Sequence, residues 1–542
     1  MLKSSSPPSS LFAKNSILLH RRWKTMSDLI KTHALLITLG LSEEEPFPSR
    51  ALSFSALSSS PGGADYAYRF LTRLSNPPKF SWNFVIRGFS DNRKKPEKTI
   101  RAYIQMLRNG FSPDHMTYPF LLKSTSRLLD ERLGGSLHSS VLKNGLVWDL
   151  YICNSLIHMY GSFRDSVSAR KVFDEMPDKN LVTWNSILDG YAKCGDVVSA
   201  RKVFDQMTER DVVSWSSMVD GYVKSGEYNE ALGVFDEMMR VSNGKANEVT
   251  MVSVLCACAH LGALNRGKAV HRYILDKHLP LTVMLRTSLI DMYAKCGSIG
   301  DAWGVFCGAN VEETDVLMWN AVIGGLASHG FIRESLQLFH KMQESEFEPD
   351  EITFLCLLAA CSHGGLVREA WHLFKSLKKS GAEPKSEHYA CMVDVLSRAG
   401  LVKDAYGFIS EMPMEPTGSM LGALVNGCIN HGNWELAETV GKRLVELQPD
   451  NDGRYVGLAN VYAVNQRFGA ARSMREAMEK RGVKKVAGHS IIELNGTPHR
   501  FIAHDKMHLD SEKIYAALHL VSIWMDLDVD DDVNENYNCI SS

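Results

Sequence analysis

Residues 181–211 read LVTWNSILDGYAKCGDVVSARKVFDQMTERD, and this stretch decides the fold. Two sets of apolar residues in it fall at i, i+3, i+4 and i+7, the spacing of one helix face. They flank a turn at 194–196 and are Trp184, Ile187, Leu188 and Tyr191, then Ala200, Val203, Phe204 and Met207. Neither short helix can bury its apolar stripe alone, so the pattern predicts a helical hairpin that stacks on similar neighbours.

The same pattern recurs along the chain. The segment AKCG at 192–195 returns at 294–297, and SLIHMY at 155–160 returns as SLIDMY at 288–293. Self-similarity of this kind predicts a solenoid. The landmarks divide the chain into about ten units of cycling length. Their ranges are 79–114, 115–149, 150–180, 181–211, 212–247, 248–282, 283–315, 316–350, 351–385 and 386–417.

Composition narrows the functional classes. Hydrophobic residues make up 45% of the 542 residues, which excludes a disordered chain, and the formal charge of -2 gives no global attraction to nucleic acid. Eleven cysteines without a CxxC pair argue for a reducing compartment. Since no apolar run reaches ~18 residues, we expect no transmembrane helix and no membrane partner.

The two ends differ from the middle. Residues 1–27 are basic and serine-rich, lack acidic residues, and have no long apolar stretch, which is typical of an organellar transit peptide. An unstructured basic tail is the alternative for this segment. Residues 524–542 are acidic and are expected to be a disordered tail.

We find no catalytic motif. A zinc deaminase needs H-x-E and P-C-x-x-C, and neither pattern occurs. Cys256 and Cys258 are two residues apart on an expected helix and therefore point to different faces. A loose cluster near the C-terminus could bind a metal but is more often polar surface; it comprises His499, His504, His508, Asp505 and Asp510. We therefore expect a protein that is not an enzyme and has no metal or cofactor.

These units resemble the pentatricopeptide repeats of plants, in the subfamily whose repeats cycle through P, L and S types. The match is carried by VTWNSILDGYAKCGDVVSARKVFDQM, TSLIDMYAKCGSIGDAWGVF, ITFLCLLAACSHGGLVREAWHLF and EHYACMVDVLSRAGLVKDA. The resemblance implies an all-α, right-handed superhelical solenoid of helix-turn-helix repeats over 79–417, preceded by degenerate repeats over 28–78.

The chain then continues with segments that resemble the E motifs of that subfamily, over 418–487. These motifs are similar to tetratricopeptide repeats. A shorter extension, 488–523, resembles the E+ segment, whereas the Asp-Tyr-Trp (DYW) ending of the family's deaminase domain does not occur. The resemblance thus implies an organellar, single-stranded RNA-binding factor that selects sites for C-to-U editing. A DYW-type deaminase acting in trans and multiple organellar RNA editing factors would be its partners.

In this family, two side chains per unit select one base: the fifth residue and the last. Short polar side chains suit this role because they donate to and accept from base edges. The resemblance implies preferences for U, C or U, U, A, G and U at six pairs. These are Asn83/Asp114, Asn154/Asn180, Asn185/Asp211, Ser216/Asn247, Thr287/Asp315 and Asn320/Asp350. A lone Asn beside Trp is otherwise a helix cap or turn residue.

The remaining units are expected to discriminate weakly because apolar side chains cannot hydrogen-bond a base. Their pairs are Pro119/Asp149, Val252/Thr282, Leu355/Lys385 and Ala390/Thr417. The implied target is U-n-Y-U-A-n-G-U-n-n, followed by three bases and the edited C.

Two further positions recur. The second residue of each unit resembles the family's apolar wedge between bases, as in Val182, Val213, Met284 and Leu317. A basic residue near the inter-helix turn could contact phosphates or could simply be solvated surface. It is Lys193, Lys224, Lys295 and Arg398 in four of the units.

The sequence leaves alternatives open. The array would equally suit an organellar factor for RNA stabilisation or splicing without a role in editing, or a helical scaffold that binds protein. The basic leader with Arg21 and Arg22 favours the mitochondrion, with the chloroplast as the alternative.

Overall fold

A computed structural model describes most of the chain. The described residues are 20, 22–58, 60–75, 77, 79–92, 95–241, 246–310, 314–485, 488–494, 497–502, 506, 508 and 510–523. Most of the expected transit segment and the whole acidic tail lie outside these residues. The chain divides into two compact units, Met1–Val254 and Leu255–Ser542, and each is described separately.

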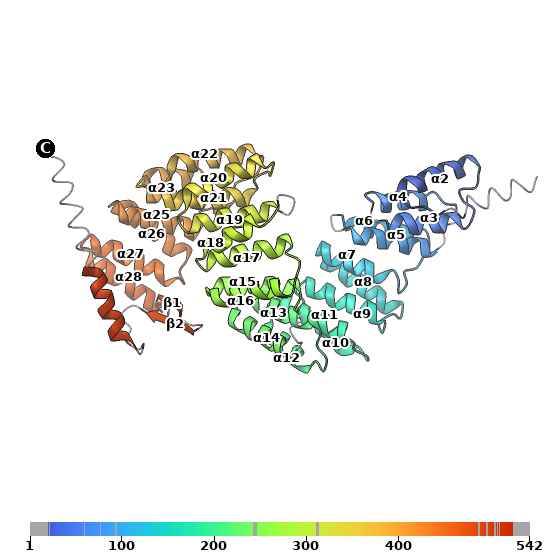
Figure 1. Cartoon of the computed structure of the whole chain (residues 1–542), viewed down its shortest axis with the longest axis horizontal. Coiled ribbons are helices and arrows are strands. Elements are labelled where there is room, and N and C mark those ends of the chain that lie inside the picture. Colours follow the sequence, from blue (N-terminus) through green and yellow to red (C-terminus); the bar gives the residue numbers. More distant parts are fainter. Residues whose placement is uncertain are drawn as a thin grey trace, which may run out of the picture. The chain divides into compact units, whose positions relative to one another are not determined.

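The first unit is a stack of antiparallel helical hairpins (Figure 1). Its helices are α2 (Met26–Thr38), α3 (Phe47–Ala56), α4 (Gly63–Leu71), α5 (Lys79–Asp91), α6 (Glu97–Arg108), α7 (Tyr118–Leu128), α8 (Glu131–Lys143), α9 (Leu150–Ser162), α10 (Ser166–Glu175), α11 (Leu181–Cys194), α12 (Val197–Gln206), α13 (Val212–Lys224) and α14 (Tyr228–Val241). The division between the units falls inside α15 (Glu248–Leu261).

The second unit continues the same hairpins and adds two strands. Its elements are α16 (Leu264–Asp276), α17 (Val283–Lys295), α18 (Ile299–Cys307), α19 (Val316–Ser328), α20 (Ile332–Glu344), α21 (Glu351–Gly364), α22 (Val367–Lys379), α23 (Ser386–Arg398), α24 (Val402–Ser410), α25 (Gly418–Asn430), α26 (Trp434–Leu447), α27 (Asp452–Val464), α28 (Phe468–Lys480), β1 (His489–Leu494) and β2 (Thr497–Ile502). The predicted solenoid of helical hairpins is confirmed.

The hairpin at 181–211 shows how sequence sets the turn. Helix α11 ends at Cys194 because Gly195 takes a left-handed backbone conformation with φ of 77°. The side chain of Asp196 then accepts a hydrogen bond from the Ser199 N–H and begins α12. The first helix of each hairpin is here called helix A, and the second helix B.

An aromatic contact joins successive hairpins. Phe173, Phe204 and Phe306 on helix B meet the Trp that lies four residues into the next unit. The ring centroids of Phe173 and Trp184 are 5.0 Å apart, those of Phe204 and Trp215 4.9 Å, and those of Phe306 and Trp319 5.0 Å, all edge-to-face. Because this Trp packs against the preceding helix B, the residue after it is held at a fixed place on helix A.

Consecutive A helices approach closely through small residues. The twelfth residue of one unit meets the tenth of the next, so a Cβ built on Gly161 would lie 2.7 Å from the Gly190 Cα. The same junction recurs at Ala192/Gly221, Ala294/Gly325 and Ser397/Gly427. Side chains larger than these would separate the helices.

A half-buried histidine recurs in two of the long units. His138 Nδ1 lies 2.8 Å from the Tyr160 hydroxyl, and His271 Nδ1 lies 2.8 Å from the Tyr293 hydroxyl. Both rings sit 5.7 Å from their tyrosine at 67°. Burial lowers the pKa of both histidines from the ordinary 6.5.

The structure departs from the sequence analysis at both ends. Trp23 packs against Phe47 and Phe54, with ring centroids 5.8 Å from each, and Thr25 caps α2. Trp23 and Thr25 fall inside the expected transit segment 1–27, and both contact the first helices of the fold. The antiparallel pair β1–β2 was not predicted in the 488–523 extension. In the part of the chain that the structure describes, no helix is both long and apolar enough for a bilayer.

We predict opposite effects of alanine at the two glycines of one junction. Gly161→Ala should destabilise the array by about 1–2 kcal/mol, because the new methyl group meets backbone on the neighbouring helix. Gly190→Ala, whose Cβ would lie 3.7 Å from the Gly161 Cα, should be neutral or stabilising. Thermal unfolding followed by circular dichroism measures both. Equal losses in the two variants would contradict the close-approach account.

We predict that the fold loses stability as pH falls below about 6.5. The folded pKa of His138 and His271 is lowered, so the unfolded chain binds protons first and acidification favours unfolding. His33 and His158 share this direction. The unfolding midpoint should therefore be lower at pH 5.5 than at pH 7.5. The double variant His138→Gln/His271→Gln should show a smaller difference, and an unchanged difference would assign the effect to other groups.

Candidate nucleic-acid interface

The structure brings the predicted selector residues together across unit boundaries. The Nδ2 of Asn185 donates to Asp211 Oδ1 over 3.1 Å, and the Nδ2 of Asn320 donates to Asp350 Oδ1 over 2.9 Å. Asn83 makes the same bond to Asp114 over 3.0 Å. Each pair joins the fifth residue of a unit to the last, so a polar station forms where two consecutive A helices meet.

The pair Ser216 and Asn247 is also joined. The Ser216 hydroxyl donates to Asn247 Oδ1 over 3.1 Å and lies 2.7 Å from the Thr250 hydroxyl. Ser216 also lies 2.6 Å from the Val212 carbonyl. This station is therefore held by hydroxyl groups where the other three use an amide.

In the pairs Asn185/Asp211 and Asn320/Asp350, the last residue of the unit is at the same time the N-cap of the next helix A. Asp211 Oδ1 accepts from the Ser214 N–H over 2.9 Å, and Asp350 Oδ1 accepts from the Thr353 N–H over 2.9 Å. One carboxylate therefore caps a helix and also belongs to a predicted selector pair. Burial raises the pKa of Asp211, but hydrogen bonds from Ser214 and Asn185 outweigh burial and leave that pKa below its usual range. This carboxylate is charged at neutral pH.

Two predicted pairs are not joined by a hydrogen bond. The buried Oδ1 of Asn154 has no hydrogen-bond partner, although Asn180 caps α11 normally. Thr287 instead donates to the carbonyl of Val283 over 2.8 Å, and Asp315 accepts a capping bond from the Met318 N–H. These two stations lie at the expected places but lack the side-chain contact seen in the other four.

An apolar ladder runs beside the stations. The second residue of nine successive units is hydrophobic, and 48% to 77% of each side chain's surface is exposed. Its members are Phe80, Met116, Tyr151, Val182, Val213, Val249, Met284, Leu317 and Ile352. The sequence analysis named four of these; the ladder includes the long units as well. Because exposed apolar patches on protein surfaces often bind partners, this repeat makes the ladder a candidate binding surface.

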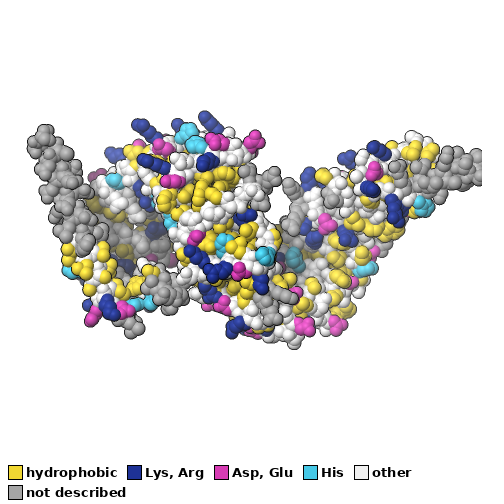
Figure 2. Space-filling model, in the orientation of Figure 1, with side chains coloured by type: hydrophobic (Ala, Val, Ile, Leu, Met, Phe, Trp, Pro, Cys, Tyr) yellow, Lys and Arg dark blue, Asp and Glu magenta, His cyan; other side chains and the backbone are white. Residues whose placement is uncertain are grey.

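The predicted basic residues are all paired with aspartate on their own helix. Lys193 and Asp189 lie 2.6 Å apart, as do Lys224 and Asp220, while Lys295–Asp291 and Arg398–Asp394 are 2.9 Å apart. The expected basic stripe is therefore a stripe of ion pairs with little net charge. Lys and Arg are likewise interspersed with Asp and Glu on the face shown in Figure 2.

A hollow of about 880 Å³ lies across helices α7, α9 and α11 of the first unit. Two ladder residues, Tyr151 and Val182, line it together with the selector Asn154. Lys123 and His158 contribute its polar wall, and burial lowers the pKa of His158. This hollow combines apolar side chains, an amide and the cations Lys123 and Arg127.

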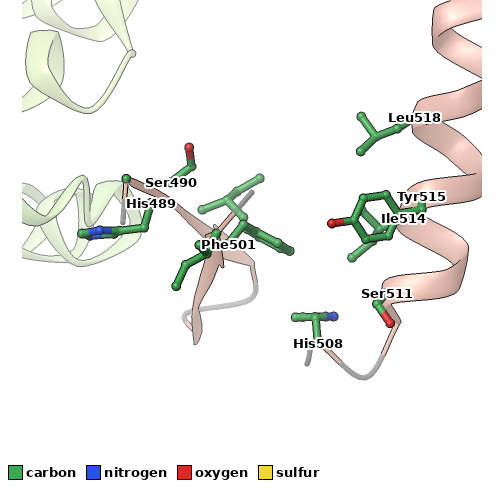
Figure 3. A pocket seen from close by; sticks show the side chains of 11 residues that line it. His489, Ser490, Phe501, His508, Ser511, Ile514, Tyr515 and Leu518 are labelled. Atoms are coloured by element: carbon green, nitrogen blue, oxygen red, sulfur yellow. The ribbon is translucent and has the colours of Figure 1, made fainter. Parts of the chain in front are cut away.

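A second hollow, of about 840 Å³, lies between the strand pair and the helix at 511–523. Figure 3 shows Phe501 on one side and Ile514, Tyr515 and Leu518 facing it from the helix. His499 Nδ1 and His508 Nε2 are 2.8 Å apart beside it. His504 and Asp505, from the cluster weighed as a metal site, lie outside the described residues. Within the described ones, no three potential metal ligands come together.

Models of known families match the chain in the same places. The PPR repeat model matches 151–181, 182–212, 286–308, 352–381 and 387–415, and a PPR repeat family model matches 210–260 and 314–363. The E motif model matches 431–493 and so overlaps both the predicted E motifs and the strand β1.

A pentatricopeptide repeat-containing protein of Arabidopsis thaliana is 79% identical over 537 residues, covering 99% of both chains. The chain belongs to the pentatricopeptide repeat family. The E motif places this pentatricopeptide repeat protein with the E class of the P, L and S subfamily. An Arabidopsis relative named as mitochondrial is 35% identical, and the match covers 95% of this chain and 89% of the relative. Another, named chloroplastic/mitochondrial, is 34% identical over 92% of this chain and 75% of its own.

Among solved structures, the pentatricopeptide repeat protein PPR10 in complex with an 18-nt psaJ RNA element superposes with a TM-score of 0.61. It is 19% identical and matches 87% of this chain and 71% of its own. At that identity, the likeness establishes the shared fold of the repeat array.

Proposed function

We propose that this pentatricopeptide repeat protein binds single-stranded RNA in a sequence-specific manner and selects cytidines for C-to-U editing in organellar transcripts. The observation that carries the proposal is the row of polar stations at Asn83, Asn185, Ser216 and Asn320, each joined to the last residue of its unit. Donor and acceptor groups that recur at the same place in several units suit unpaired bases presented one at a time.

The apolar ladder supports the same proposal. An exposed hydrophobic side chain precedes each station by three residues, as Val182 precedes Asn185 and Leu317 precedes Asn320. Base faces stack on apolar and aromatic surface irrespective of sequence, which supplies affinity, while the stations supply discrimination. The RNA complex named for PPR10, a protein of the same fold, is consistent with RNA binding by the repeat array.

Editing rather than another RNA role is favoured by the C-terminal segment. The E motif match at 431–493 would be unnecessary for a factor that only stabilises or splices a transcript. We assign deamination to a DYW-type deaminase in trans, assisted by multiple organellar RNA editing factors, and assign no catalytic role to this chain. The mitochondrion is the proposed compartment, with the chloroplast as the alternative; relatives are named for both.

The function is tested by comparing editing across all organellar transcripts in plants with and without the protein. A few cytidines preceded by U-n-Y-U-A-n-G-U-n-n should lose editing. Loss of a transcript end or an intron, with every cytidine still edited, would instead favour the stabilisation or splicing role.

We predict that Asn320→Thr shifts the preferred base at the eighth target position from U toward G. The change makes this pair equivalent to Thr287/Asp315, for which G is the implied base, and it replaces one small polar side chain by another. Binding of RNAs with each of the four bases at that position measures the shift. Thermal unfolding of the variant serves as the control, and indifference of binding to the swap would argue against base reading at this station.

We predict that Asp291→Asn increases RNA affinity and steepens its salt dependence. The substitution releases Lys295, whose Nζ is 2.9 Å from the Asp291 carboxylate, for contact with phosphate. Each added phosphate contact changes the salt slope by up to about one. The double variant Asp291→Asn/Lys295→Gln should lose the gain. Unchanged affinity in the single variant would assign these ion pairs to solvated surface.

A further inference from the structure

The three stations that join an Asn to an Asp contain a third residue that the base-selection scheme leaves unused. It is the third residue of the following unit, Thr117, Ser214 or Thr353, and its side chain is fully buried. The Thr353 hydroxyl lies 2.6 Å from Asn320 Oδ1 and 3.0 Å from Asp350 Oδ1, and it accepts from the Asp350 N–H over 3.1 Å.

The other two stations repeat this geometry. The Ser214 hydroxyl is 2.7 Å from Asn185 Oδ1 and 2.9 Å from Asp211 Oδ1. The Thr117 hydroxyl is 2.7 Å from Asn83 Oδ1 and 2.9 Å from Asp114 Oδ1. Asn, Asp and a hydroxyl residue thus form a three-membered network, here called the selector triad, at each of these stations.

The triad fixes the orientation of the asparagine amide. A hydroxyl has one proton, and the shorter distance in each triad runs to the amide oxygen. The carboxylate in turn accepts from the amide nitrogen. Turning the amide by 180° would place its oxygen against the carboxylate, so the two neighbours hold nitrogen and oxygen on defined sides.

Amide orientation matters because uracil and cytosine differ by an exchange of donor and acceptor on their pairing edges. A turned amide exchanges its own donor and acceptor in the same way. An amide that is free to turn can satisfy both bases, whereas a fixed one leaves the wrong base with unpaired groups. Discrimination of this kind comes from the groups left unpaired.

The chain contains a natural counterpart without the third contact. Thr183 is fully buried and forms the same capping box with Asn180, with its hydroxyl 3.0 Å from Asn180 Oδ1. However, the Oδ1 of Asn154, the fifth residue of that unit, has no hydrogen-bond partner. Capping and contact with the selector amide are therefore separable within one protein.

We propose that Thr353, Ser214 and Thr117 are positioning residues for base selection, which lock the selector amide so that the station distinguishes uracil from cytosine. This inference rests on the proposed RNA-binding function. The hydroxyl touches no base itself; it acts through the amide and the carboxylate that it bridges.

The test compares Thr353→Val with Thr183→Val in the full chain. Each substitution removes one buried hydroxyl from a capping box and keeps the side-chain shape. The probes are synthetic RNAs of the target U-n-Y-U-A-n-G-U-n-n, with U or C at position 8 for the first variant and at position 3 for the second. Thr353→Ser, which retains the hydroxyl as Ser214 does, is the rescue variant.

We expect Thr353→Val to reduce the ratio of U to C affinity at position 8 by about fivefold to tenfold, the worth of one hydrogen bond. Thr353→Ser should keep the ratio, and Thr183→Val should leave the ratio at position 3 unchanged. Thermal midpoints should fall by similar amounts in the two valine variants, because both lose a capping contact.

Three results would overturn the inference while leaving RNA recognition intact. These are an unchanged ratio in Thr353→Val, an equal loss of U and C affinity in that variant, or a changed position 3 ratio in Thr183→Val. A wild-type protein that does not distinguish U from C at position 8 would instead refute the proposed function at this station, and the inference with it.

Discussion

The close approach of consecutive A helices is the constraint on which the rest of the array depends. Glycine, alanine or serine at the tenth and twelfth residues lets the two backbones come within contact distance, as at Gly161 and Gly190. At such a separation a side chain at the fifth residue of one unit reaches the start of the next, as Asn185 reaches Asp211 in the two units that share the Ala192/Gly221 junction. The Phe–Trp contact on the other side of helix A then sets its rotation. The spacing between A helices and the rotation of each helix together decide where the fifth residue of a unit lies.

Much of this was predictable from the sequence. The 3.6-residue periodicity and the glycine turns predicted the hairpins, and the recurring Trp-Asn pairs predicted the positions of the selector pairs. The hydrogen bonds within four of those pairs follow from the same register. Periodicity could not predict whether the two side chains of a pair form a hydrogen bond. Asn154/Asn180 and Asn185/Asp211 look alike in sequence yet differ in their contacts.

Other features were missed although their signals were present. Each basic residue of the stripe has an Asp four residues earlier, a spacing that indicates an ion pair on a helix. Asn495-Gly496 between two β-rich runs is a strong hairpin signal, and it separates β1 from β2. The packing of Trp23 on Phe47 could not be foreseen, because it depends on tertiary contacts made by a segment of leader-like composition.

The charge pattern determines how the surface that carries the ladder and the stations can attract a ligand. Its cations are largely neutralised on their own helices, while the ladder and the stations offer apolar surface and oriented dipoles. Such a surface relies on stacking and on defined hydrogen bonds more than on long-range attraction, which suits a protein whose net charge is close to zero.

The selector triad also changes which stretch of the chain forms one recognition unit. Its three members come from two units, so a cut at the border after Asp350 separates Asn320 and Asp350 from Thr353. A single repeat transplanted into another array would bring the Asn and Asp of one triad without their hydroxyl residue. It would also bring the hydroxyl residue of the preceding triad without its Asn and Asp. A chimaera that preserves specificity should therefore be joined within helix A between the third and the fifth residue, so that each recombined block contains one whole triad.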